Sequence, residues 1–125
     1  MKKRRTATPT IMLSAAFRAF CDLHRAGYFA YAAARLSRDE AKVAVAHTFA
    51  LIAGDWPTAV NRPNPAAYAW HLHTRYVTSC TGKTTSREQD AALMHDRLNL
   101  TVDRIATLTG TEPAAVTAML AAAHR

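Results

Sequence analysis

The spacing of aromatic and apolar residues is the strongest constraint on how this chain can fold. In its first third they recur every three or four positions, as Phe17, Phe20, His24, Tyr28 and Tyr31. Such spacing places them on one face of a helix, which we expect over about residues 11–36. Glycine occurs only four times in 125 residues, and no Val/Ile/Thr alternation runs for six residues. We therefore predict an all-α fold.

Capping residues and helix breakers divide the next part of the chain. Ser37 or Asp39 can cap a second helix, which Gly54 ends. Three prolines stand in the nine residues 57–65, which predicts a loop from Trp56 onward. Pro65 suits the first turn of a third helix that continues to about residue 79.

A polar linker and three short helices complete the predicted order. Residues 81–86 are polar, and short helices are expected at 88–99, 102–108 and 113–123. Gly110 falls between the last two, which is the helix-turn-helix pattern. We divide the chain into a basic tail (1–10), a three-helix module (11–79), a linker (80–88) and a helix-turn-helix module (89–125). The short linker favours a compact arrangement of the two modules.

Positive charge is concentrated in two segments. The chain has a net charge of +7, and residues 1–5 contribute four of these charges. Residues 61–87 contribute another four, through Arg62, Arg75, Lys83 and Arg87, and contain no acidic residue. Such patches attract phosphate backbones. Nucleic-acid contact is therefore expected, and the alternative is a composition that is simply rich in arginine.

The order of these segments resembles that of bacterial sigma factors of the extracytoplasmic-function group. The shared features are a long aromatic helix, a helix with Ala41 and Thr48-Phe49, a loop with tryptophan, an aromatic helix begun by proline, and a C-terminal helix-turn-helix. Residues 17–77 resemble region 2, and residues 90–125 resemble a shortened region 4. The resemblance implies that the first part docks on RNA polymerase core and captures the melted promoter −10 strand. It implies that the second part reads the −35 element.

The second helix departs from that family on its exposed face. Members carry Ala-Glu-Asp-x-x-Gln-x-x-Phe, whereas this chain has Lys42, Val43 and Ala46 at the two acids and the glutamine. Replacing glutamate by lysine turns attraction to a basic partner surface into repulsion. These residues, with His47, therefore form a candidate surface for a different protein partner: a sigma factor, an anti-sigma-like regulator or another copy of this chain.

The third helix provides the candidate nucleic-acid interface. Tyr68, Trp70, His71, Arg75 and Tyr76 place rings beside positive charge, which is what holding an unstacked strand requires. Two further residues, Arg62 and Lys83, lie just outside this helix and complete the set. The alternative for Tyr68 and Trp70 is that they pack in the core, because aromatic residues at helical spacing usually do.

The last helix lacks the side chains that read bases. Residues 115–124 contain no Arg, Lys, Asn or Gln, and these are the residues that make bidentate base contacts. Its alanine-rich face, with Thr117 and Met119, is better suited to protein contact.

No motif in the chain indicates catalysis or a cofactor. Residues 81–85 resemble the end of a phosphate-binding loop, but Val77 stands where its first glycine is needed. His71 and His73 are two apart on a helix and would not converge with Cys80 on a metal ion. With two cysteines, no apolar stretch of about 20 residues and no signal peptide, we expect a cytoplasmic protein that is no enzyme and has no metal site or membrane contact.

Three functions remain open at this point. The first is a sigma-like transcription regulator that contacts DNA through the three-helix module. The second is a protein-interaction module that keeps the sigma framework without promoter recognition. The third, a sensor of small molecules, requires a pocket between the two modules, and such a pocket cannot be seen in a sequence.

Overall fold

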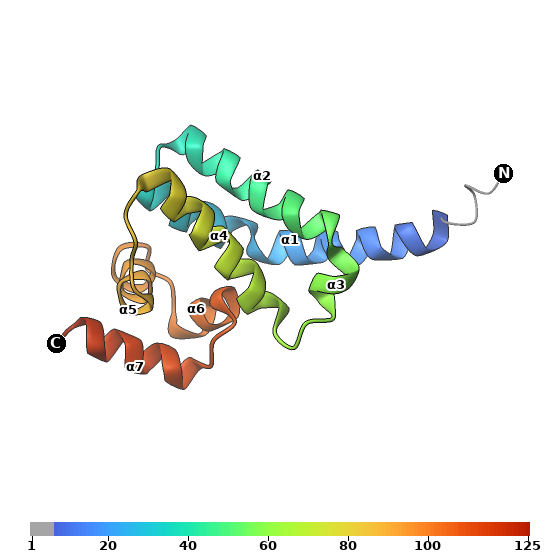
Figure 1. Ribbon diagram of the computed structural model, residues 1–125. Helices are drawn as coiled ribbons and strands as arrows, with labels where there is room; N and C mark the ends of the chain where they lie inside the picture. The colour runs from blue at the N-terminus through green and yellow to red at the C-terminus, as the bar shows by residue number, and fades with distance from the viewer. Residues whose placement is uncertain (1–6) are drawn as a thin grey trace.

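The computed structural model describes residues 7–125, with side chains from residue 15 onward, and this part of the chain is helical without strands (Figure 1). The all-α prediction is thus confirmed. Residues 1–6 of the predicted basic tail lie outside the described part, and its last four residues belong to the first helix. The elements are α1 (Ala7–Arg35), α2 (Arg38–Gly54), α3 (Trp56–Val60), α4 (Pro65–Thr81), α5 (Arg87–Ala92), the π-helical turn η2 (Leu93–Arg97), α6 (Val102–Thr109) and α7 (Pro113–Ala123).

The helices begin where the sequence supplies caps. Ser37 accepts a hydrogen bond from the amide of Glu40, and the Glu40 carboxylate accepts one from the Ser37 amide, so a complete capping box starts α2. Ser86 starts α5 with the same arrangement, and the Thr101 side chain caps α6. Each of these caps satisfies amides at a helix start that have no partner within the helix.

The segment around Trp56 is where the prediction was wrong. A loop was expected, yet Trp56–Val60 forms the short helix α3 with Pro57 in its first turn. Proline is tolerated there because the amide it lacks has no helical partner at that position. The Trp56 ring is buried and packs edge-on against Phe17 and Phe20 of α1, so packing on α1 fixes this segment.

The helices α1, α2 and α4 lie alongside one another and enclose the first half of the core (Figure 1). Tyr28 and Tyr31 of α1 have no exposed surface. The N-terminal part of α1 extends beyond the body formed by the other helices (Figure 1).

The helices α5 to α7 pack on the first half of the chain, as the short linker predicts. Their buried residues join those of α1, α2 and α4 in one core cluster. The turn between α6 and α7 rests on the start of α4, where the Asn64 amide donates a 2.8 Å hydrogen bond to the Gly110 carbonyl. The same Asn64 side chain caps α4 by accepting from the Ala67 amide. One residue thus starts α4 and attaches the C-terminal helices to it.

Within residues 7–125, no helix is long and apolar enough to cross a membrane.

Candidate functional site

Three of the predicted nucleic-acid residues lie on one side of α4, here called its outer face: His71 and Arg75 are exposed there, and Tyr68 is half-buried and also packs against the core. Tyr68, His71 and Arg75 follow one another at helical spacing, so they lie along one side of the helix. Arg62, in the loop before α4, places its guanidinium carbon 3.7 Å from the centre of the Tyr68 ring. This is a close cation–π contact, and it positions the Arg62 charge beside α4.

The basic residues of this region are exposed and free of acidic partners. Arg62, Arg75, Lys83 and Arg87 are all exposed, and none takes part in an ion pair among the described residues. Because an unpaired exposed cation keeps its full attraction for anions, these four remain available to phosphate or carboxylate groups.

Trp70 and Tyr76 do not join the outer face. Trp70 is half-buried and meets the rings of Tyr28 and Tyr31 edge-on, with centroids 5.5 and 4.8 Å apart. Trp70 therefore packs mainly against the core, which was the alternative to nucleic-acid contact for this residue. Tyr76 lies on the side of α4 that faces α2 and stacks on His47, with ring centroids 4.2 Å apart. Spacing alone did not distinguish these positions, because it gives the direction of a side chain but not the helix it meets.

Two of the four candidate protein-contact residues of α2, Lys42 and Ala46, line a hollow between α1 and α2, and Val43 and His47 lie outside it. The hollow has a volume of about 690 Å³ and is also lined by Phe29 and Phe49. Val43 is 56% exposed, and it precedes Ala46 by one turn on the same helix. His47 is exposed but is held by the stacked Tyr76 ring.

A larger groove separates α4 from the C-terminal helices. Its volume is about 840 Å³, and it is lined by Trp70, His71 and Arg75 from α4 and by residues of α5, η2, α6 and α7. Met119 of α7, which the sequence marked for protein contact, lines it as well. Thr117 instead lies on the exposed face of α7. The groove thus joins residues that the sequence had assigned to two separate interfaces.

A buried polar chain that the sequence did not reveal closes the linker end of this groove. The Arg35 guanidinium donates to the Tyr31 hydroxyl at 2.8 Å, and that hydroxyl donates to Asp90 at 2.9 Å. Thr85 donates to the same carboxylate oxygen at 2.7 Å. Burial raises the pKa of Asp90, and burial with the nearby Asp90 raises the pKa of Tyr31 to about 12. These bonds connect α1, the linker and α5.

His73 is a core histidine of α4. Its Nε2 atom lies 2.9 Å from the Tyr28 carbonyl, which can only accept, so Nε2 carries the proton. Burial lowers the pKa of His73 to about 4, so the ring is neutral, and its Nδ1 lies 3.1 Å from the Thr48 hydroxyl, whose single proton is shared with the Ala44 carbonyl 3.0 Å away. The ring is fully buried and is therefore not free to bind a metal with His71 or Cys80.

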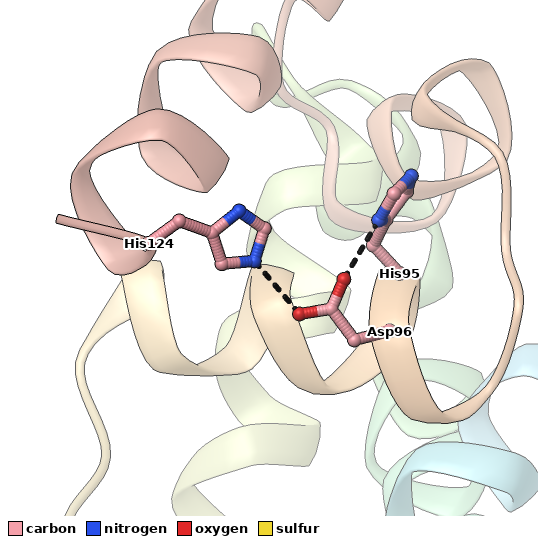
Figure 2. Close-up of polar contacts among 3 residues, drawn as sticks. All are labelled: His95, Asp96 and His124. Carbon is pink, nitrogen blue, oxygen red and sulfur yellow. Dashed lines mark hydrogen bonds and ion pairs between the residues drawn. The ribbon is translucent and has the colours of Figure 1, made fainter.

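An exposed cluster attaches the end of α7 to η2. Figure 2 shows the Asp96 carboxylate between two imidazole rings, one oxygen 3.0 Å from His95 Nδ1 and the other 2.8 Å from His124 Nε2. These hydrogen bonds lower the pKa of Asp96. Among the described residues, no group of three or more His, Cys, Asp or Glu side chains is arranged to hold a metal ion. The cluster is best understood as a surface link between two helical segments.

The sequence matches no protein-family model, and neither a curated protein nor a solved structure is significantly similar to this chain.

Proposed function

We propose that this chain is a sigma-factor-like transcription regulator that holds single-stranded DNA on the outer face of α4. The observation that carries the proposal is the Arg62–Tyr68 stack, continued along α4 by the exposed side chains of His71 and Arg75. The absence of acidic residues from 61 to 87 supports it, because no acidic side chain within α4 or the segments next to it in sequence opposes the approach of a phosphate backbone.

The chemistry of this face suits an unstacked strand. The Arg62 guanidinium is planar and can stack on a base while it covers Tyr68. Arg75 and Lys83 lie farther along the same region and supply charge for successive phosphates. The named groups of this face are cations and rings, which contact any phosphate and any base ring, so we expect affinity for the backbone and for base rings rather than a strict base sequence.

Fluorescence anisotropy with a labelled single-stranded promoter-like oligonucleotide, measured across a salt series, tests this function. Binding should weaken steeply with salt, by a slope of about 0.7 log units per phosphate contact. Arg62→Ala and Arg75→Ala should each weaken binding to every sequence and reduce the slope. Arg97→Ala, which removes an exposed arginine of η2 outside this face, is the matched control. Affinity that does not change with salt, or an equal loss in the Arg97→Ala variant, would overturn the proposal.

A second function is supported by the hollow between α1 and α2. Its apolar residues Phe29, Val45 and Phe49, bordered by the charged Asp22, Arg25 and Lys42, offer a contact surface for a protein. The exposed Val43 side chain lies outside the hollow on α2. In this alternative, the chain binds a regulator, another sigma factor or itself. A pull-down from the native host should then recover a partner that Val43→Glu releases and Thr117→Glu, on the exposed face of α7, retains. Stoichiometric recovery of RNA polymerase core subunits would count against this alternative.

A further inference from the structure

The groove between α4 and the C-terminal helices has the features of a binding site for a small molecule. Its volume of about 840 Å³ lies within the range of ligand pockets in proteins, roughly 300–1,000 Å³. The apolar surface that it offers comes from the half-buried Ala67, Trp70, Ala115 and Met119. Ala91, Met94, Ile105 and Val116 also line the groove but are each at most 2% exposed. A pocket between the two halves of the chain is also what a sensor of small molecules requires.

Charge is distributed unequally along the groove. At the linker end, Arg75 of α4 and Arg87 at the start of α5 both line it, and neither has an ion-pair partner among the described residues. The other end lies where Ala67 meets Gly110, and there Glu112 lines the wall. Asp90 also lines the linker end, but its carboxylate is occupied by Tyr31 and Thr85. A ligand with one anionic end and an apolar body matches this polarity.

We propose that the groove binds an amphiphilic carboxylate, whose anionic group lies between Arg75 and Arg87 and whose apolar body extends along Trp70 toward Ala67. Arg75 lies eight positions after Ala67 on α4, which is about 12 Å along a helix axis. A medium-length alkyl chain or a small aromatic acid fills that length. The two arginines supply charge-assisted hydrogen bonds, which exceed neutral ones in strength. This site does not require the proposed DNA-binding function, although Arg75 belongs to both surfaces.

Decanoate is the direct probe, and the fluorescent anion anilinonaphthalene sulfonate reports on it by displacement. The intact chain should bind one equivalent of the dye saturably, and decanoate below its micelle concentration should displace it. Decanol and decylammonium, which keep the alkyl chain but lack the negative charge, should displace it at least about tenfold less well. Unsaturable dye binding, or equal displacement by all three compounds, would overturn the proposal.

Paired variants locate the binding to this groove. Ala115→Trp places a large ring in the groove from α7 and should abolish decanoate binding, whereas Ala46→Trp, in the hollow between α1 and α2, should leave it unchanged. Arg87→Gln should weaken decanoate by about tenfold and leave decanol unaffected, with Arg97→Gln as the control. Thermal unfolding of each variant verifies folding, and Arg87→Gln decides the outcome if Ala115→Trp does not fold. The opposite pattern in either pair would overturn the proposal.

Discussion

Replacing Gly110 by alanine should separate the helix-turn-helix from the rest of the chain. Gly110 has a φ of +71°, where an alanine side chain costs about 1–2 kcal/mol. A β-carbon at this position would lie 2.4 Å from the Ala67 amide nitrogen and 2.8 Å from its Cα, so backbone must move. That movement breaks the bond from Asn64 to the Gly110 carbonyl, worth about 1 kcal/mol. With the packing lost between α4 and α6, the total is about 3–5 kcal/mol.

Gly82→Ala is the matched control for this prediction. Gly82 has nearly the same φ, +73°, but nothing lies within 4 Å of the β-carbon it would gain. Only the conformational cost of about 1–2 kcal/mol applies there. Urea unfolding, followed by far-ultraviolet circular dichroism, measures the free energy of unfolding of both variants. If the two variants lose equal stability, then the close approach of Gly110 to α4 does not support this fold, and the reasoning is refuted.

Two further variants test the buried polar groups. The pKa of His73 is about 4 in the fold and 6.5 when unperturbed, so below pH 6.5 the unfolded chain takes up the proton first. The free energy of unfolding should therefore fall by up to about 3 kcal/mol as the pH drops from 6.5 to 4, and His73→Gln should show a shallower decline in pH-dependent urea titrations. Tyr31→Phe removes the hydroxyl between Arg35 and Asp90 and should cost about 2 kcal/mol. Tyr68→Phe, whose hydroxyl makes no such bond in the described part, should cost near zero, and equal losses would contradict the role of this hydroxyl.

The helix boundaries could be predicted because their signals are local. Ser37, Pro65 and Gly110 act through their own backbone or the next turn, and α2, α4 and the α6–α7 turn begin or end at these positions. The loop expected at Trp56 was wrong because a distant contact decides it. Pro57 is tolerated in the first turn of α3, and the packing of Trp56 on α1 stabilises that turn.

The candidate site could be predicted only in part, for a related reason. Arginine side chains are charged and mostly exposed, so Arg62 and Arg75 could be predicted as members of a cationic surface. Trp70 packs on α1 and Tyr76 packs on α2. The spacing of residues along α4 does not show which neighbouring helix each ring contacts. The groove is less predictable still, because α4 forms one wall and four separate helical segments between residues 87 and 119 form the other. A groove between two packed parts of a chain depends on how those parts meet, so no short stretch of sequence predicts it.

If both proposals hold, the DNA-binding face and the groove share His71 and the guanidinium of Arg75, and the coupling through Arg75 can be measured. Arg75 lies on the outer face of α4 and also lines the groove, so a carboxylate bound to it withdraws one cation from DNA. Saturating decanoate should weaken oligonucleotide binding severalfold, and by linkage the oligonucleotide should weaken decanoate by the same factor. Arg62→Ala should preserve this antagonism, since Arg62 contacts Tyr68 outside the groove, whereas Arg75→Ala should abolish it. Antagonism that survives Arg75→Ala would show that the two ligands meet elsewhere on the chain.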